Sequence, residues 1–214
     1  MDIKYDYDKV VENKFYNVTK FVCKIAIQFR NKYKCVGQEN VPQEGRLIIA
    51  SNHISSFDPA YIMVKSKRPC HFMAKVQLFE NNLLAKILIK SNAFPVDRDK
   101  LDRKALKHAG LVLENEKVLG IFPEGTRSKT LKPIEAKNGV GMIALMSKAD
   151  ILPVSIYRDP EDNSLRKKVT LRFGEVIKFD EIKFESDKKS LQTHQLTNII
   201  MGEIVSLWEE GHCK

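Results

Sequence analysis

A histidine and an aspartate that four residues separate follow a short apolar stretch of this 214-residue chain. His53 is mostly a neutral base near pH 7 if its pKa is unperturbed, so it can take a proton from a hydroxyl. A carboxylate such as that of Asp58 can fix the imidazole tautomer and stabilise the imidazolium that forms. The pair therefore suits general-base catalysis of acyl transfer, provided that the fold brings the two side chains together.

No nucleophile of the chain's own accompanies this pair. The sequence contains no G-x-S-x-G turn, and none of its four cysteines has a local nucleophile signature. We therefore expect the substrate to supply the nucleophile, which predicts acyl transfer onto an alcohol without a covalent enzyme intermediate. Taken alone, a loop histidine bonded to a helix cap is the simpler interpretation of this spacing.

A second polar cluster lies at residues 122–128, Phe-Pro-Glu-Gly-Thr-Arg-Ser. Gly125 permits a tight turn with positive φ, and Arg127 offers a planar fork that can grip a phosphate through two hydrogen bonds. Lys75 and Arg98, each near the end of a predicted strand, can bring further positive charge to the same edge. The alternative is that Glu124 and Arg127 form a surface ion pair, which contributes little.

The elements that must position these side chains can be predicted from the apolar patterning. Residues 47–50 are short, apolar and β-branched, which predicts a buried strand. Asp58 is then expected to be the N-cap of the following helix, with Pro59 at its first position. His53 thus falls on a strand-to-helix loop, where open parallel sheets commonly place their chemistry.

The remainder of the chain alternates short apolar stretches with helical periodicity. Further strands are predicted at residues 70–75, 93–98, 118–122, 151–156 and 169–173, and helices at residues 59–65, 83–89, 101–112, 140–147 and 191–208. Pro153 favours an edge position or a bulge for its strand. The alternation predicts a single α/β domain with a largely parallel sheet flanked by helices on both faces.

The N-terminal part differs in character. Residues 1–13 are polar and expected to be frayed, whereas residues 15–33 carry apolar side chains at three- and four-residue intervals among lysines. This amphipathic, basic helix either docks on the chain's own core or lies in an anionic membrane interface, and both can hold at once. We divide the chain into an N-terminal amphipathic helical segment, 1–36, and an α/β domain, 37–214.

The formal charge of +9 favours an anionic partner, such as nucleic acid, a membrane face or a phosphorylated substrate. A nucleic-acid-binding module is disfavoured because the basic residues are dispersed and no recognised motif is present. No stretch reaches the roughly 18 apolar residues of a membrane-crossing helix. The cysteines are scattered and no signal peptide is evident, which indicates a reducing compartment. The other four histidines lack metal-ligand spacing, so no metal is expected.

Taken together and in order, four blocks of this sequence resemble the motif blocks of the glycerolipid acyltransferase family. They are Asn52-His53-x-Ser55-x-x-Asp58, Phe94-Pro95-Val96-Asp97-Arg98, Phe122-Pro123-Glu124-Gly125-Thr126-Arg127-Ser128 and Leu152-Pro153-Val154. Within the family, the chain is most similar to the members that acylate 1-acyl-sn-glycerol-3-phosphate. The blocks lie between about residues 46 and 157, just over half of the chain.

The resemblance implies a role for each matched residue. His53 would be the base and Asp58 its partner. The remaining roles concern the substrates: Lys75, Arg98 and Arg127 would bind the acceptor's phosphate, Glu124 and Gly125 would shape the acceptor pocket, and the Pro153 block would lie on the acyl-donor side.

The activity that the resemblance implies is transfer of a fatty acyl group from acyl-CoA or acyl-carrier protein to the sn-2 hydroxyl of lysophosphatidic acid. The product would be phosphatidic acid for phospholipid synthesis. Glycerol-3-phosphate or another lysophospholipid is the alternative acceptor. No cofactor is expected beyond the acyl donor as co-substrate. The N-terminal helix would seat the enzyme peripherally on the anionic, cytoplasmic face of the cell membrane.

Overall fold

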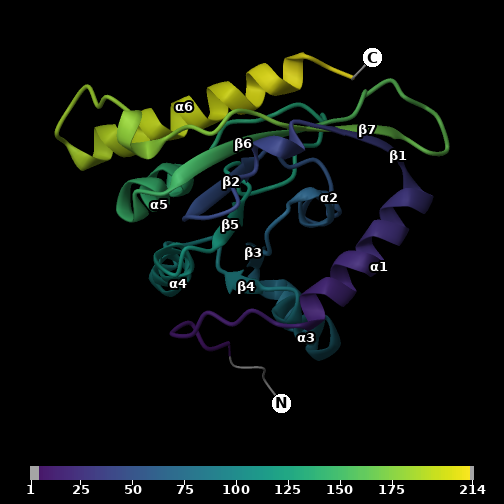
Figure 1. The fold of residues 1–214 in the computed structure, drawn as a ribbon, viewed down its shortest axis with the longest axis horizontal. Coiled ribbons are helices and arrows are strands. Elements are labelled where there is room, and N and C mark those ends of the chain that lie inside the picture. Colours follow the sequence, from purple (N-terminus) through teal and green to yellow (C-terminus); the bar gives the residue numbers. More distant parts are fainter. Residues whose placement is uncertain (1–4, 213–214) are drawn as a thin grey trace.

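A seven-stranded sheet forms the centre of the fold, with strand order β1-β7-β6-β2-β5-β3-β4. The computed structural model describes residues 5–212 (Figure 1). The strands are Lys32–Val36 (β1), Leu47–Ser51 (β2), Cys70–Lys75 (β3), Ala93–Val96 (β4), Val118–Ile121 (β5), Asp150–Tyr157 (β6) and Lys168–Phe173 (β7). Neighbouring strands are parallel, apart from β6 and β7, which are antiparallel. The predicted single α/β domain with a largely parallel sheet is confirmed.

Helices cover both faces of this sheet. They are Phe15–Arg30 (α1), Asp58–Lys65 (α2), Asn82–Lys90 (α3), Arg103–Glu114 (α4), Gly139–Ser147 (α5) and Lys189–Glu209 (α6), with short 3₁₀ turns at Gln38–Asn40 (η1), Val76–Phe79 (η2) and Phe179–Glu181 (η3). Apolar residues of α1 and α2 pack on one face, and those of α4, α5 and α6 on the other (Figure 1). Because both faces are covered, β2 is buried at every position and its sequence is continuously apolar.

The strand directions bring the candidate residues to one edge of the sheet. β2, β3, β4, β5 and β6 all run the same way, so their carboxyl ends share an edge. His53 follows β2, Lys75 ends β3, Arg98 follows β4 and Glu124 follows β5. These four residues are far apart in the sequence but lie at the same edge of the sheet.

The N-terminal part differs from its prediction in two respects. The first helix ends at Arg30 rather than at residue 33, and Lys32–Val36 forms β1, which pairs with β7. The sequence predicts that residues 1–13 are frayed, of which residues 1–4 lie outside the described part of the chain. Within the others, Tyr5 Oη and His108 Nε2 are 2.9 Å apart and Tyr7 Oη donates to the Pro95 carbonyl oxygen, so this part is held on the domain. The division of the chain at residue 36 stays a prediction. β1 lies before this boundary and β7 lies after it, and the two strands pair in one sheet.

Pro153 lies in an interior strand, so the expected edge position was wrong, whereas the alternative, a bulge, is present beside it. Val154 pairs with Phe173 but Ile151 pairs with Ile177, so the segment after β7 has one residue more than β6 between these two pairs. β6 pairs with β7 on one side and β2 on the other, with Pro153 opposite Ala50. Proline has no N–H to donate toward the β7 side, where the Gly174 amide donates to the Pro153 carbonyl oxygen. Asn40 Nδ2 donates to the Gly174 carbonyl oxygen (2.8 Å) and satisfies that acceptor instead.

Candidate active site

The loop after β2 brings His53 and Asp58 into direct contact. His53 Nδ1 lies 2.7 Å from Asp58 Oδ2, and Asp58 is fully buried. Because an ionised carboxylate only accepts hydrogen bonds, Nδ1 carries the proton and Nε2 keeps its lone pair. Within residues 5–212 Nε2 has no hydrogen-bond partner, so it is available to accept a proton from a hydroxyl.

Asp58 does not serve as the N-cap that the sequence predicted. The helix α2 begins at Asp58 itself, and its cap residue, Phe57, makes no side-chain hydrogen bond. The Asp58 carboxylate turns back to the loop instead, where Oδ2 also accepts from the amides of Ile54 and Ser55, each at 2.7 Å. These bonds hold the carboxylate against the imidazole, so Asp58 organises the histidine loop rather than the helix end.

The loop is tied to the sheet by Asn52. Its side-chain amide donates to the Ile156 carbonyl oxygen (3.0 Å), and its side-chain oxygen accepts from the Ile156 amide (2.7 Å). This reciprocal pair extends the contact between β2 and β6 past the last paired residue of β2, Ser51. His53, the next residue, thus leaves the sheet from a fixed point.

Residues 122–128 pack directly against the histidine loop. The rings of His53 and Phe122 stack with centroids 4.2 Å apart, and the Ser128 amide donates to the His53 carbonyl oxygen (2.7 Å). Gly125 has φ of 68°, in the left-handed region that its sequence position predicted. The two sequence clusters therefore form one structural unit.

The buried side chain of Glu124 connects residues 122–128 with the histidine loop. Its Oε2 accepts from the His53 amide (3.2 Å) and its Oε1 from the Ile134 amide (3.2 Å), while the residue is only 2% exposed. Burial raises the pKa of its carboxyl to about 7, although both amide bonds favour the charged form. The acceptor-pocket role of Glu124 stays a prediction, but these contacts indicate that it positions the backbone of His53.

We expect Glu124→Gln to lower kcat about tenfold, because an amide replaces one of the two acceptor oxygens by a donor that faces an N–H.

The buried carboxyl of Glu124 binds a proton more tightly in the folded state than in the unfolded state, where its pKa is near 4.5. Its stabilising contribution is therefore complete below pH 4.5 and is lost as the pH rises through about 7. Urea unfolding at pH 5 and pH 8 measures this loss, which should be absent from the glutamine variant. An equal pH dependence in both proteins would contradict the assignment.

Two arginines, Arg98 and Arg127, lie in or beside this unit, near enough for the charge of one to act on the other. Arg98 donates through Nη1 to the Gly125 carbonyl oxygen (2.9 Å) and through Nη2 to that of Met73 (3.3 Å). Burial, and then the positive charge of Arg127, lower the pKa of Arg98. Among the residues that the structure describes, neither arginine forms an ion pair with a carboxylate. Two neighbouring arginines without an ion-pair partner favour an anion near this position.

Two lysines extend the positive charge. Lys75 is the exposed last residue of β3 and pairs in register with Val96, two residues before Arg98. Lys137 lies in the loop before α5, where its Nζ donates to the Arg98 carbonyl oxygen (3.4 Å) and its methylenes pass Gly125. Lys137 could not be recognised from the sequence, because it stands outside every motif and only the fold of its loop brings it back to Gly125.

An apolar pocket of about 230 Å³ opens next to these cations. Its floor is formed by side chains from β3, β4, β5, α4 and α5, and Arg98, Gly125 and Lys137 are also among its lining residues. The apolar lining residues are Met73, Val96, Leu101, Leu106, Ile121, Phe122, Val140, Met142 and Ile143. Since Phe122 stacks on His53, the pocket reaches the immediate neighbourhood of the imidazole. The arrangement offers a base, an apolar recess and a charged rim, in which Arg98, Lys100 and Lys137 are accompanied by Asp97 and Asp102.

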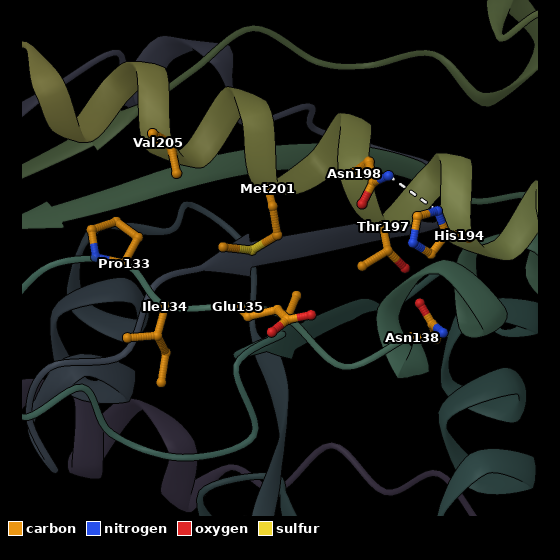
Figure 2. Close-up of a pocket in the computed structure, with 10 residues that line it drawn as sticks. Pro133, Ile134, Glu135, Asn138, His194, Thr197, Asn198, Met201 and Val205 are labelled. Atoms are coloured by element: carbon orange, nitrogen blue, oxygen red, sulfur yellow. Dashed lines mark hydrogen bonds between the residues drawn. The ribbon is translucent and has the colours of Figure 1, made fainter.

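A second cavity, of about 400 Å³, lies between residues 133–138 and α6 (Figure 2). Its polar groups include Glu135 and the pair His194 and Asn198, whose Nδ1 and Nδ2 are 3.1 Å apart. None of the residues singled out in the sequence lines this cavity. Across residues 5–212, no group of three or more histidine, cysteine or acidic side chains is placed to hold a metal ion.

The chain is similar in sequence to known proteins. A model of the acyltransferase family matches residues 32–157. The chain is 32% identical over 146 residues to a Bacillus subtilis 1-acyl-sn-glycerol-3-phosphate acyltransferase, covering 68% of this chain and 72% of the relative. A Streptococcus pneumoniae protein of the same name is 31% identical over 173 residues, covering 78% of this chain and 62% of the relative.

A solved structure extends the comparison to the fold. The structure of the 1-acyl-sn-glycerophosphate (LPA) acyltransferase PlsC from Thermotoga maritima superposes with a TM-score of 0.72. It covers 93% of this chain and 81% of its own, at 23% sequence identity. At 23% identity this similarity shows a shared fold, which extends over 93% of this chain.

Proposed function

The chain belongs to the acyltransferase family, and from that premise we propose that it transfers a fatty acyl group from an acyl thioester to the sn-2 hydroxyl of 1-acyl-sn-glycerol-3-phosphate. The observation that carries the proposal is the contact between His53 and Asp58 beside two arginines that lack a counter-charge. A base next to an anion site suits an acceptor that bears both a hydroxyl and a phosphate. The apolar recess suits its fatty chain.

In the proposed reaction, His53 Nε2 takes the proton of the sn-2 hydroxyl as that oxygen attacks the thioester carbonyl carbon. The new C–O bond forms, the C–S bond breaks, and the proton passes from the imidazolium to the departing thiolate. Phosphatidic acid and a free thiol are the products. Asp58 stabilises the imidazolium between the two proton transfers. Because a thioester is already reactive, much of the rate enhancement comes from holding the alcohol in place.

A matrix of acceptors and donors tests the proposal. Thiol release would be measured with vesicles present, for acyl-CoA and acyl-carrier protein against lysophosphatidic acid, glycerol-3-phosphate and a lysophospholipid with a bulkier headgroup. The proposal predicts that lysophosphatidic acid gives the highest kcat/KM. A higher value for glycerol-3-phosphate or for the bulkier acceptor would reassign the acceptor, and the lack of thiol release with every acceptor would contradict an acyltransferase activity.

Arg127→Ala is expected to raise the KM for lysophosphatidic acid about tenfold or more, with a smaller effect on kcat. A lost phosphate contact weakens binding in the ground state and in the transition state alike, and hydrogen bonds to charged groups contribute about 1.5–3 kcal/mol. Arg103→Ala is the matched control, because Arg103 is exposed at the start of α4. An unchanged KM for Arg127→Ala would place this side chain away from the acceptor.

We further propose that α1 and α3 together seat the protein on an anionic membrane surface. Most apolar residues of α1 are exposed rather than docked on the core, and only Tyr16 and Ile27 of that helix are buried. Two contacts join the helices: Lys90 Nζ lies 5.2 Å from the centroid of the Phe15 ring, and Ser91 Oγ donates to Thr19 Oγ1 (3.1 Å).

The resulting α1–α3 face has exposed apolar residues from three elements. They are Phe15, Val18, Phe21, Val22, Ile25 and Phe29 of α1, Leu78 of η2, and Leu83, Leu84 and Ile87 of α3. The lysines of α1 and α3 supply attraction to anionic headgroups. Figure 1 shows α3 beside the N-terminal end of α1. No helix within residues 5–212 is long and apolar enough to span a membrane, so this face would act by partial insertion.

Replacing Phe21 and Phe29 together by glutamate is expected to reduce binding to anionic vesicles at least tenfold, measured by co-sedimentation. Phe29 is 80% exposed and Phe21 63%, so the substitutions spare the core. Each phenylalanine contributes about 1.5–3 kcal/mol when fully buried in an apolar phase. Leu191→Glu, at an exposed position of α6, is the control that should bind normally. Undiminished sedimentation of the double variant would exclude this face as the membrane contact.

A further inference from the structure

A third cavity, of about 420 Å³, lies where α1 ends and β1 begins. It is lined by Gln28, Asn31, Lys32, Tyr33, Lys65 and Arg166. Half of these side chains are cationic and none is acidic. The three cations come from three segments of the chain, β1, α2 and the loop before β7. It is an open depression of the surface, in which Lys32 and Arg166 are exposed and Lys65 is half-buried.

The cations of this pocket keep their charge uncompensated. Lys32, Lys65 and Arg166 form no ion pair with a carboxylate in the part of the chain that the structure describes. Arg166 Nη2 donates to the carbonyl oxygens of Gln28 and Asn31, and Lys65 Nζ lies 5.1 Å from the centroid of the Tyr33 ring. These contacts hold the side chains in place without neutralising them. The pocket is therefore built for an anion.

Further groups connect the pocket to His53 and Asp58. The hydroxyl of Tyr61, on α2, donates to Asn31 Oδ1 at the pocket wall (2.7 Å), and the Arg30 guanidinium lies 4.6 Å from the ring centroid of Phe57, the residue before Asp58. Burial raises the pKa of Tyr61, and the positive charges of Arg30 and Arg158 oppose that rise. Arg158 Nε is buried without a hydrogen-bond partner within residues 5–212. Arg30 and Arg158 therefore add positive charge close to Tyr61 on α2.

The separation between the pocket and the catalytic pair matches the shape of an acyl donor. Asp58 begins α2 and Lys65 ends it, so the helix places them about 10 Å apart along its axis. A pantetheine arm joins the thioester sulfur to a phosphate through about as many bonds as four peptide residues, and reaches roughly 14 Å when extended. With the thioester at His53, the phosphate of the arm can therefore reach the pocket.

We propose that the pocket formed by Lys32, Lys65 and Arg166 binds the phosphate end of the acyl donor, whether the arm belongs to coenzyme A or to a carrier protein. This inference rests on the proposed function and deepens it, since it assigns a donor site distinct from the Arg98 and Arg127 rim that receives the acceptor. The acceptor's phosphate and the donor's phosphate would then bind at two separate groups of cations, and the reacting oxygen and carbonyl carbon would meet at the imidazole.

The test compares the wild-type protein with the Lys32→Glu/Lys65→Glu double variant on two donors that carry the same acyl chain. Acyl-CoA has the phosphates, whereas acyl-pantetheine has the same arm without them. We expect the KM for acyl-CoA to rise at least tenfold in the variant, and the KM values for acyl-pantetheine and lysophosphatidic acid to change less than twofold. The control, Lys104→Glu/Lys189→Glu, makes the same charge change at exposed positions on α4 and α6 and should resemble the wild type.

The remaining outcomes are equally decisive. An acyl-CoA KM that stays unchanged in the double variant, or a rise of the same size for acyl-pantetheine, would overturn the proposal. Reduced sedimentation of the variant with anionic vesicles, at an unchanged KM for detergent-dispersed acyl-CoA, would assign the pocket to lipid headgroups instead. A parallel assay measures the KM for acyl-carrier protein as the donor. The donor whose KM rises in the double variant, acyl-CoA or acyl-carrier protein, is the one whose arm the pocket binds. Inactivity of the wild type with every thioester would reject the proposed function itself, independently of this pocket.

Discussion

His53→Ala is expected to reduce the rate of thiol release about 10³-fold, because the variant lacks the base that takes the proton of the attacking hydroxyl. General-base catalysis contributes about 10²- to 10⁴-fold in enzymes, and no other side chain is hydrogen-bonded to Asp58 in the described part of the chain. The measurement is the initial rate with acyl-CoA and lysophosphatidic acid, both saturating.

The fold should survive this substitution, since the backbone contacts of His53 to Glu124 and Ser128 do not involve the imidazole. Circular dichroism and thermal unfolding check that point. His194→Ala is the control, because His194 is an exposed histidine of α6 far along the chain from the motif. Retention of more than a few per cent of the wild-type rate by the His53 variant would show that the imidazole is not the base.

Asp58→Asn is expected to lower kcat about 10²- to 10³-fold while the KM for lysophosphatidic acid changes little. In the structure a single oxygen, Oδ2, accepts all the hydrogen bonds that Asp58 receives, and Oδ1 is buried without a partner. An asparagine can set its oxygen at the Oδ2 position and keep these bonds, so the substitution mainly removes the negative charge that stabilises the imidazolium.

The asparagine variant should also lose about 1–3 kcal/mol of stability, because its amide nitrogen would occupy the buried, unpartnered position of Oδ1. Asp58→Ala separates the two effects. It removes the hydrogen bonds as well as the charge, so we expect a larger loss of stability, measured by urea unfolding. A kcat for Asp58→Asn within threefold of the wild type would mean that the carboxylate charge takes no part in catalysis.

The sequence predicts the parts of this fold that depend on continuous burial. The strand at Leu47–Ser51 and its neighbours β5 and β6 are apolar at most positions because helices cover both faces of the sheet, and this patterning can be recognised without tertiary information. The contact between His53 and Asp58 follows from their position on one short loop. The approach of residues 122–128 follows from the shared direction of β2 and β5.

Features that depend on tertiary contacts could not be predicted in the same way. β1 alternates exposed lysines with half-buried Tyr33 and Cys35 and resembles the end of a basic helix until β7 is beside it. Pro153 is tolerated in an interior strand only because Asn40, far away in the sequence, satisfies the Gly174 carbonyl oxygen. Glu124 faces two backbone amides, one of them ten residues further along a loop without a pattern.

The proposed reaction requires that the acceptor's own hydroxyl attacks the thioester. The most direct measurement compares thiol release from acyl-CoA with lysophosphatidic acid, with its analogue that lacks the sn-2 hydroxyl, and without any acceptor. We predict one molecule of phosphatidic acid for each thiol released from the first mixture, and no release above the uncatalysed background from the other two. Thiol release at a similar rate without the sn-2 hydroxyl would contradict the account, since it would mean that water or a side chain of the protein takes the acyl group.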